Sequence, residues 1–171
     1  MQRIYIVGSS GAGKSTLARK LAEKLGLKHT ELDAVHWQAD WTELDKDVFR
    51  QRVSELVTGE RWVIDGNYRA VQDIILARID TLIWLDYSLA RLYRQLVPRT
   101  LKRVFRSEPL WNGNRETFRN QFLSRNSLLL YIYKVHKDQR EHYRQLSTQT
   151  NSFAVLRFRT PQELEKWLES V

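Results

Sequence analysis

The feature that most constrains this chain is a phosphate-loop motif near its amino end. Residues 8–15 read Gly-Ser-Ser-Gly-Ala-Gly-Lys-Ser and match the pattern G-x-x-x-x-G-K-[S/T] at every fixed position. The apolar stretch 3–7 predicts a buried strand before the motif, and apolar residues at helical spacing over 15–25 predict a helix after it. This strand–loop–helix order is the context in which the motif binds phosphate. The alternative interpretation is a Gly/Ser turn that holds a lysine by chance.

The motif assigns a chemical role to each of its parts. Glycines let main-chain N–H groups turn inward around phosphate oxygens, and the following helix adds the positive end of its dipole. We expect Lys14 to reach the β- and γ-phosphates of a nucleotide, and the Ser15 hydroxyl to ligate Mg²⁺. The sequence thus predicts a site for a nucleoside triphosphate.

The rest of the chain alternates strands and helices, which predicts an α/β fold with a parallel sheet covered on both faces. A length of 171 residues fits one domain, 1–171. We expect strands near 2–7, 28–32, 62–65, 81–86 and 153–156. We expect helices over 15–25, 45–58, 70–78, 88–105 with a kink or break at Pro98, 117–146 and from 161 onward, and loops over 33–42 and 106–116. The helical insertion at about 99–144 interrupts this alternation and is predicted to cover the phosphates as a lid.

Charge is distributed unevenly along the chain. The net charge is +8, and residues 91–144 alone hold 13 Lys/Arg against 4 Asp/Glu. Such a segment favours an anionic partner, either nucleotide phosphates, a phosphorylated substrate or nucleic acid, and a solvated helical face is the alternative. The absence of cysteine excludes disulfides and thiolate chemistry. With no apolar run long enough to cross a bilayer, we expect a cytoplasmic monomer or homodimer that does not bind membranes.

Three aspartates follow predicted strands, at the sheet edge where ligands of parallel sheets bind. Asp65 is a candidate Mg²⁺ ligand of the Walker-B kind, or else it starts the turn at Gly66. Asp33 is placed near the γ-phosphate as a base or an acceptor-binding group, or else it caps a turn. Asp86 is interpreted as the N-cap of the next helix.

Arginines and aromatic residues supply the remaining candidates. Arg94, Arg99 and Arg103 lie along the helix that contains Pro98, and Arg115 and Arg119 follow the next loop. At least one of them is expected to stabilise charge on the transferring phosphoryl group. Trp37 and Trp41 either stack on a substrate ring or cover the edge of the core. We interpret the histidines at 29, 136 and 142 as structural, without an evident partner, and His36 lacks the companions of a zinc site.

Four stretches of this sequence resemble the adenylate-kinase-like branch of P-loop kinases, and within it the group of DNA topology modulation proteins. They are 8–15, Leu-Asp-Ala-Val-His-Trp at 32–37, Trp-Val-Ile-Asp-Gly-Asn-Tyr at 62–68 and Leu-Trp-Asn-Gly-Asn-Arg-Glu at 110–116. The resemblance implies a three-layer P-loop NTPase sandwich, with a five-stranded parallel sheet of order 2-3-1-4-5 and a lid between strands four and five. It also implies that ATP and Mg²⁺ are bound by Gly8, Ser9, Gly11, Ala12, Gly13, Lys14, Ser15 and Thr16.

The acceptor side departs from the adenylate-kinase pattern. Asp65 and Arg69 match the ends of the Asp-Gly-Phe-Pro-Arg run of adenylate kinases, whereas Asn67 and Tyr68 do not. Those enzymes carry Thr-Gly-Asp after strand two, and this chain has Leu-Asp-Ala at 32–34, which is more similar to shikimate- and gluconate-type kinases. The departure argues against AMP as the acceptor.

We therefore predict an enzyme that transfers a phosphoryl group from ATP, with Mg²⁺, to a small-molecule acceptor. The predicted catalytic residues are Lys14, Asp33, Arg99 and Arg103, and the predicted acceptor-side residues are Asp33, Trp37, Asp65, Asn67, Arg69 and Arg115. The alternative is an ATPase that binds nucleic acid through 91–144, although no recognition motif is visible. A GTP-driven switch ranks last because the chain lacks an Asn-Lys-x-Asp guanine motif.

Overall fold

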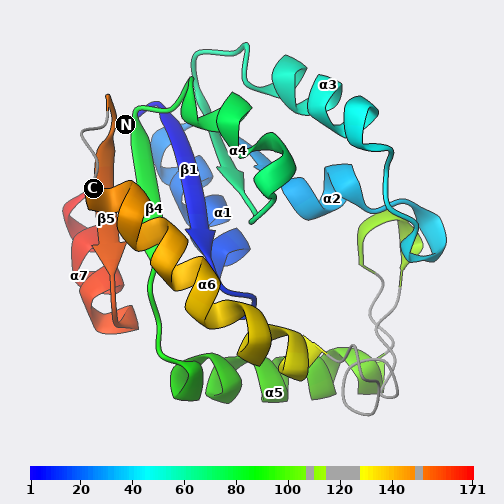
Figure 1. Ribbon diagram of the computed structural model, residues 1–171. Helices are drawn as coiled ribbons and strands as arrows, with labels where there is room; N and C mark the ends of the chain where they lie inside the picture. The colour runs from blue at the N-terminus through cyan, green and yellow to red at the C-terminus, as the bar shows by residue number, and fades with distance from the viewer. Residues whose placement is uncertain (107–109, 115–127, 149–151) are drawn as a thin grey trace.

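Five parallel strands form one sheet of order β2-β3-β1-β4-β5, as predicted (Figure 1). The computed structural model describes residues 1–106, 110–114, 128–148 and 152–171. The strands are β1 Arg3–Gly8, β2 Lys28–Glu31, β3 Trp62–Asp65, β4 Thr81–Leu85 and β5 Ala154–Phe158. The described helices are α1 Lys14–Leu25, α2 Leu32–His36, α3 Lys46–Leu56, α4 Arg69–Leu76, α5 Leu89–Arg106, α6 Leu128–Thr148 and α7 Pro161–Ser170, with 3-10 turns η1 Ala39–Trp41 and η2 Trp111–Gly113.

Strand register brings the carboxyl ends of the three adjacent strands β1, β2 and β3 to one edge. Asp65, the last residue of β3, pairs with Ile6 on β1 and with Glu31 on β2. The phosphate loop therefore leaves β1 beside the two segments that follow β2 and β3. This edge is where ligands bind in open parallel sheets.

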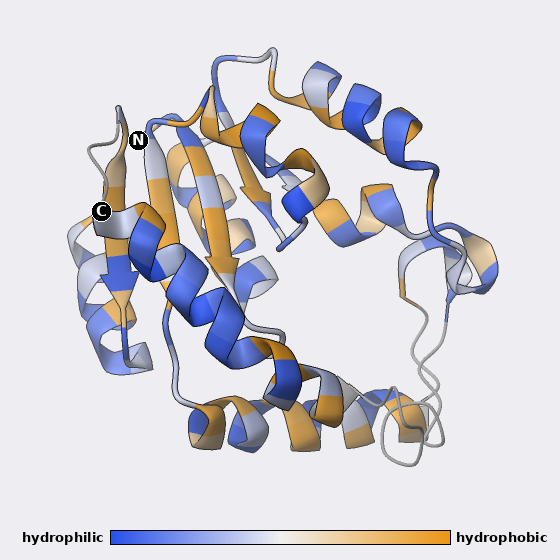
Figure 2. Ribbon diagram, in the orientation of Figure 1, coloured by the Kyte–Doolittle hydropathy of each residue, from blue (hydrophilic) through white to orange (hydrophobic). Residues whose placement is uncertain are grey.

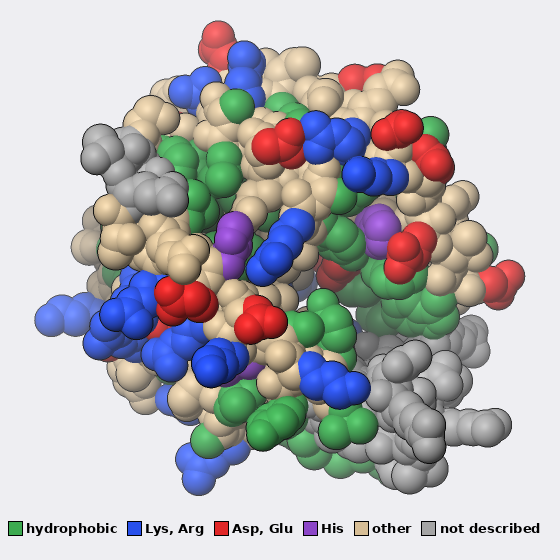
Figure 3. All heavy atoms as spheres, viewed as in Figure 1, with side chains coloured by type: hydrophobic (Ala, Val, Ile, Leu, Met, Phe, Trp, Pro, Cys, Tyr) green, Lys and Arg blue, Asp and Glu red, His purple; other side chains and the backbone are tan. Residues whose placement is uncertain are grey.

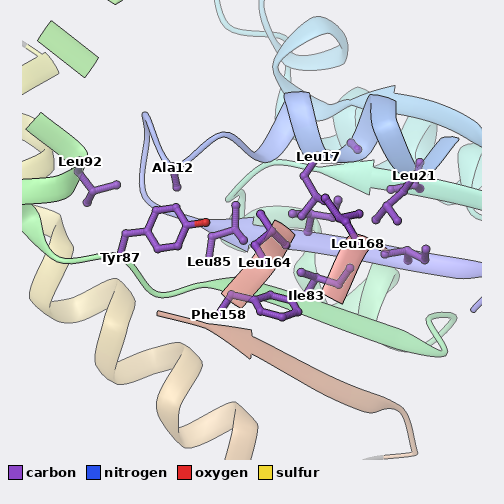
Figure 4. Packing of buried hydrophobic residues seen from close by; sticks show 14 of the residues in the cluster. Ala12, Leu17, Leu21, Ile83, Leu85, Tyr87, Leu92, Phe158, Leu164 and Leu168 are labelled. Atoms are coloured by element: carbon purple, nitrogen blue, oxygen red, sulfur yellow. The ribbon is translucent and has the colours of Figure 1, made fainter. Parts of the chain in front are cut away.

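Two hydrophobic clusters hold the three layers together. On one face, α1 and α7 pack against the sheet through residues that include Leu17, Leu21, Leu164 and Leu168 (Figure 4). On the other face, α3, α4 and part of α6 pack against Tyr5 and its neighbours. The three central strands β3, β1 and β4 are mostly apolar (Figure 2) and almost wholly buried, which is the pattern of a parallel sheet buried on both sides.

The chain between β4 and β5 leaves the sheet through α5 and returns through α6 (Figure 1). Of the predicted kink or break at Pro98, the break is wrong, because α5 runs through this residue from Leu89 to Arg106, and the kink stays a prediction. A proline removes one helical hydrogen bond, but the buried Leu92 and Leu96 fix this helix against the core. The described helix α6 begins at Leu128, so the predicted helical stretch 117–127 lies outside the described residues.

Two segments predicted as loops contain short helices. The segment after β2 folds into α2 and η1, and the segment 110–114 contains η2. Other predicted boundaries shift by a few residues. Asp45 and Thr160 cap the helices that follow them, because both side chains accept main-chain N–H groups of the following turn. Among the described residues, no helix has the length and apolar character needed to cross a membrane.

Candidate nucleotide and acceptor site

The phosphate loop joins β1 directly to α1 and depends on glycine for its shape. Gly8, Gly11 and Gly13 have φ of 144°, 84° and 92°, in the region that side chains rarely adopt. Gly13 is the N-cap of α1 and offers no side-chain hydrogen bond to the helix. The first N–H groups of α1 are therefore left to a ligand, as anion binding at a helix N-terminus requires.

Lys14 lies at the centre of a cluster of charged residues. Its half-buried side chain donates from Nζ to the main-chain oxygen of Ser9 at 3.3 Å. Burial lowers the pKa of Lys14, the carboxylates of Asp33 and Asp65 oppose this shift, and the Arg99 guanidinium adds to it. The fold thus brings together four of the predicted site residues, from β1–α1, α2, β3 and α5.

Asp65 is 3% exposed, and both of its carboxylate oxygens have partners. Oδ2 accepts the Ser15 hydroxyl at 2.7 Å, and Oδ1 lies 2.8 Å from Nε2 of His29. The interpretation of His29 as a residue without a partner is wrong. The contact joins positions 36 residues apart on paired strands, and a single sequence does not reveal such a pairing.

A hydroxyl and a carboxylate are ligands that suit Mg²⁺, which usually retains waters and phosphate oxygens as its other ligands. Ser15 and Asp65 would supply these two groups, directly or through water. Within the described ranges no group of three or more His, Cys, Asp or Glu residues could hold a metal on its own. The residues therefore fit a metal that arrives with a nucleotide rather than a dedicated protein cage.

The acceptor side is built around Asp33 and Tyr68. Asp33 lies in the first turn of α2 and its Oδ1 accepts the Tyr68 hydroxyl at 2.6 Å. The Tyr68 ring packs against Phe49 and His36, with centroids 5.3 and 4.5 Å away. Burial, and then the Asp33 charge, raise the pKa of Tyr68, so it remains a donor that fixes the Asp33 carboxylate. The sequence did not predict this role of Tyr68, which was noted only as a departure from the adenylate-kinase pattern.

Trp37 and Trp41 lie beside this aromatic group and belong to neither core cluster. Their rings meet edge to face with centroids 5.5 Å apart, and both side chains are half-buried. This arrangement does not support the interpretation that the two tryptophans cover the edge of the core. Contact of Trp37 with a substrate stays a prediction.

The segment 110–114, in the middle of the β4–β5 insertion, docks on the acceptor side. Asn114 is 4% exposed, accepts the Trp41 N–H at 2.8 Å and donates to the Gln38 oxygen at 2.7 Å. Trp111 donates its indole N–H to Glu31 at 3.0 Å. Sequence reasoning placed these residues in a loop and assigned them no contact.

The remaining predicted residues differ in placement. The amide of Asn67 donates to the Gly8 oxygen at 2.6 Å and accepts the Gly8 N–H at 3.2 Å, so it holds the phosphate loop. Arg69 is exposed at the start of α4, and Arg103 is half-buried on α5. Arg115 lies outside the described residues, and acceptor binding by Asn67, Arg69 or Arg115 stays a prediction.

Three further interpretations of the sequence are corrected by contacts between distant elements. Asp86 does not cap α5: its buried carboxylate accepts Arg140 at 2.7 Å and Arg157 at 2.9 Å. Ring nitrogens of His136 and His142 also have partners, at the Ser9 hydroxyl and the Gln72 amide oxygen. These partners lie 54 to 127 residues away in the sequence, beyond the reach of local patterns.

Known proteins that are similar to this chain include two shikimate kinases. The chain is 25% identical over 150 residues to a shikimate kinase of Persephonella marina, covering 75% of this chain and 84% of that protein. It is 40% identical over 105 residues to a shikimate kinase of Sulfurihydrogenibium sp., covering 52% of this chain and 63% of that one. These relatives indicate a P-loop phosphotransferase and leave its acceptor unspecified.

A solved shikimate kinase from Acinetobacter baumannii, in complex with shikimate, superposes with a TM-score of 0.62. The superposition covers 99% of this chain and 94% of that one at 17% identity, which establishes the P-loop kinase fold alone. No protein-family model matches the chain.

Proposed function

We propose that this protein transfers the γ-phosphoryl group of ATP, with Mg²⁺, to a hydroxyl of a small molecule bound beside Asp33. The observation that carries the proposal is the 2.7 Å hydrogen bond from the Ser15 hydroxyl of the phosphate loop to the Asp65 carboxylate. Beside it lies Lys14, whose pKa is influenced by burial and by the charges of Asp33, Asp65 and Arg99. In this arrangement Lys14 of the nucleotide site and Asp33 of the acceptor site would both lie beside the γ-phosphate that is transferred. The kinase relatives support the same reaction type.

In this reaction the main-chain N–H groups of the loop and Lys14 bind the β- and γ-phosphates. Ser15 and Asp65 would hold Mg²⁺, and the ion would neutralise charge on the phosphates when bound. Asp33, whose carboxylate is fixed by Tyr68, takes the proton of the acceptor hydroxyl while the oxygen of that hydroxyl bonds to the γ-phosphorus. The bond to the β,γ-bridging oxygen breaks and ADP leaves, while the Arg99 guanidinium balances the developing charge.

The test is ADP release in the presence of ATP, Mg²⁺ and a panel of hydroxyl compounds that includes shikimate, gluconate, nucleosides and nucleoside monophosphates. We expect one acceptor class to raise ADP release sharply. The Asp33→Asn variant should lose about 100-fold or more of that rate, since general base catalysis contributes on this scale, and should still bind ATP. The exposed Asp47→Asn variant, in the first turn of α3, is the matched control. A flat panel with wild-type protein would overturn the proposal.

The alternative assignment, a nucleic-acid-associated ATPase of the DNA topology modulation group, makes a different prediction. It requires ADP release to rise with polynucleotide, and binding to DNA or RNA to weaken steeply as salt rises. Acidic side chains lie among the basic ones on the face in Figure 3, and Arg140 of the basic segment is paired with buried Asp86. We therefore favour the small-molecule kinase, and a gel shift at low salt separates the two.

A further inference from the structure

Helix α6, the return arm of the insertion, contacts the first half of the phosphate loop through Ser9. The Ser9 side chain is buried, with its hydroxyl 3.1 Å from Nδ1 of His136 and donating to Gln139 at 3.3 Å. The main-chain oxygen of the same residue accepts Lys14 Nζ and the Ala12 N–H. Ser9 thus joins α6 on one side to the phosphate-binding ammonium on the other.

A second connection reaches Gly8 from the same helix. The Tyr143 hydroxyl of α6 donates at 3.3 Å to the Asn67 side-chain oxygen, and the Asn67 amide holds both the N–H and the carbonyl of Gly8. Two successive residues of the loop are therefore tied to one helix through side chains.

Helix α6 is itself fixed to the sheet next to these contacts. Arg140 binds the buried carboxylate of Asp86, just past β4, which also binds Arg157 of β5. A small cavity of about 10 Å³, roughly the size of one water, lies between α6 and the loop and is lined by Ser9, His136 and Tyr143 among others. The contact is therefore a packed, largely polar interface rather than an incidental approach.

We propose that His136 is a positioning residue for the phosphate loop: by holding the Ser9 hydroxyl it fixes the Ser9 carbonyl, and through it the place of Lys14. The inference rests on the proposed function, since its effect is on nucleotide binding at that site. It gives the insertion a role in donor binding through α6, in addition to any contact of its arginines with the phosphates.

The test compares two histidines of the same helix. His142 is half-buried, whereas His136 is buried, and it binds Gln72 of α4 rather than a residue of the phosphate loop, so His142→Ala is the control for His136→Ala. Calorimetry with a non-hydrolysable ATP analogue and Mg²⁺ gives the affinity, and thermal unfolding gives the stability of each variant. We expect His136→Ala to weaken binding about tenfold, the equivalent of one lost hydrogen bond, and His142→Ala to leave it unchanged.

Two further variants separate positioning from a loss of fold. His136→Asn places an amide where Nδ1 lies and should bind the ATP analogue with an affinity within about twofold of that of the wild type. The expected loss in His136→Ala, which lacks the hydrogen bond, is about tenfold. Ser9→Ala removes the same contact from the other side and should add nothing to His136→Ala. Equal binding by His136→Ala and wild type, or equal weakening by His142→Ala, overturns the inference and leaves the proposed function intact. Absence of binding by the wild type overturns both.

Discussion

At the scale of single residues, the site depends on backbone positions where a side chain does not fit. Gly66, directly after Asp65, has a φ of 138°, and a Cβ there would lie 2.7 Å from Cβ of Leu32. A Cβ on Gly8, at the start of the phosphate loop, would lie 2.7 Å from the main-chain oxygen of Leu85. The segments that follow β1 and β3 can therefore lie this close to their neighbours only with glycine at these positions.

We expect Gly66→Ala to lower the free energy of unfolding by about 1–3 kcal/mol, because strain of this kind costs that much. Gly59→Ala is the control, since Gly59 does not have a positive φ and its nearest neighbour would be Trp62 at 3.8 Å. This change should be neutral or stabilising by up to about 1 kcal/mol. Urea denaturation measures both, and equal effects of the two substitutions would contradict the account.

At the scale of elements, the acceptor side is assembled from two turns that are distant in sequence. The turn at 38–42 and the turn at 110–114 each contain residues with positive φ, and buried Asn114 joins them through its amide. The insertion is thereby fixed to the segment that follows β2, next to Asp33. Changes in the middle of the insertion should therefore be felt on the acceptor side.

Replacing Asn114 with alanine should loosen the turn that contains Trp41. The substitution removes the acceptor of the Trp41 N–H and the donor to Gln38, at a cost of about 1–3 kcal/mol for a buried polar contact. Hydrogen exchange at the Trp41 amide should become faster. Asn112→Gly is the control, because it removes the exposed side chain that donates to the Trp37 oxygen and glycine tolerates the positive φ of this position. An unchanged hydrogen-exchange rate at the Trp41 amide in Asn114→Ala would contradict the proposed role of Asn114 in joining the two turns.

Local patterns predicted the elements whose signal is local. The phosphate loop and the five strands were predictable because the motif and the apolar runs each lie within a few residues. The order of the strands came from the resemblance and not from a local pattern. The partners of His29, Asp86 and Asn114 were not, because each contact joins segments more than 30 residues apart. Helix α2 was missed because five residues carry too little periodicity to separate a helix from a loop.

At the scale of the whole molecule, buried His136 and half-buried His142 make stability depend on pH. Burial lowers the pKa of His136, an effect that Arg140 increases and Asp86 opposes, and burial together with Arg69 lowers that of His142. Both rings are neutral in the native protein at a pH where the unfolded chain, with an ordinary histidine pKa near 6.5, takes up protons. Stability is therefore full above about pH 7 and falls as the pH drops toward 5.

Thermal unfolding between about pH 5 and 7 tests this dependence, because carboxylates such as Asp73, with a pKa lowered to about 2 by Arg50, titrate below that window. The wild-type Tm should fall with decreasing pH. A variant with both His136→Asn and His142→Gln should have a flatter profile. A wild-type Tm that is constant over this range, or equal slopes for the two proteins, would contradict the assignment.

The central claim is that Lys14 and the main chain of the phosphate loop together bind the phosphates of a nucleotide. Calorimetry of Mg²⁺-ATP with wild type, Lys14→Ala and Lys20→Ala tests it most directly. Lys20 lies on the same helix and pairs with Glu165 at the exposed surface, so it controls for the loss of a positive charge. We predict binding by wild type and Lys20→Ala, and binding at least about tenfold weaker by Lys14→Ala, because charge-assisted bonds to phosphate are strong. No binding by the wild-type protein, or equal binding by all three, would contradict the account.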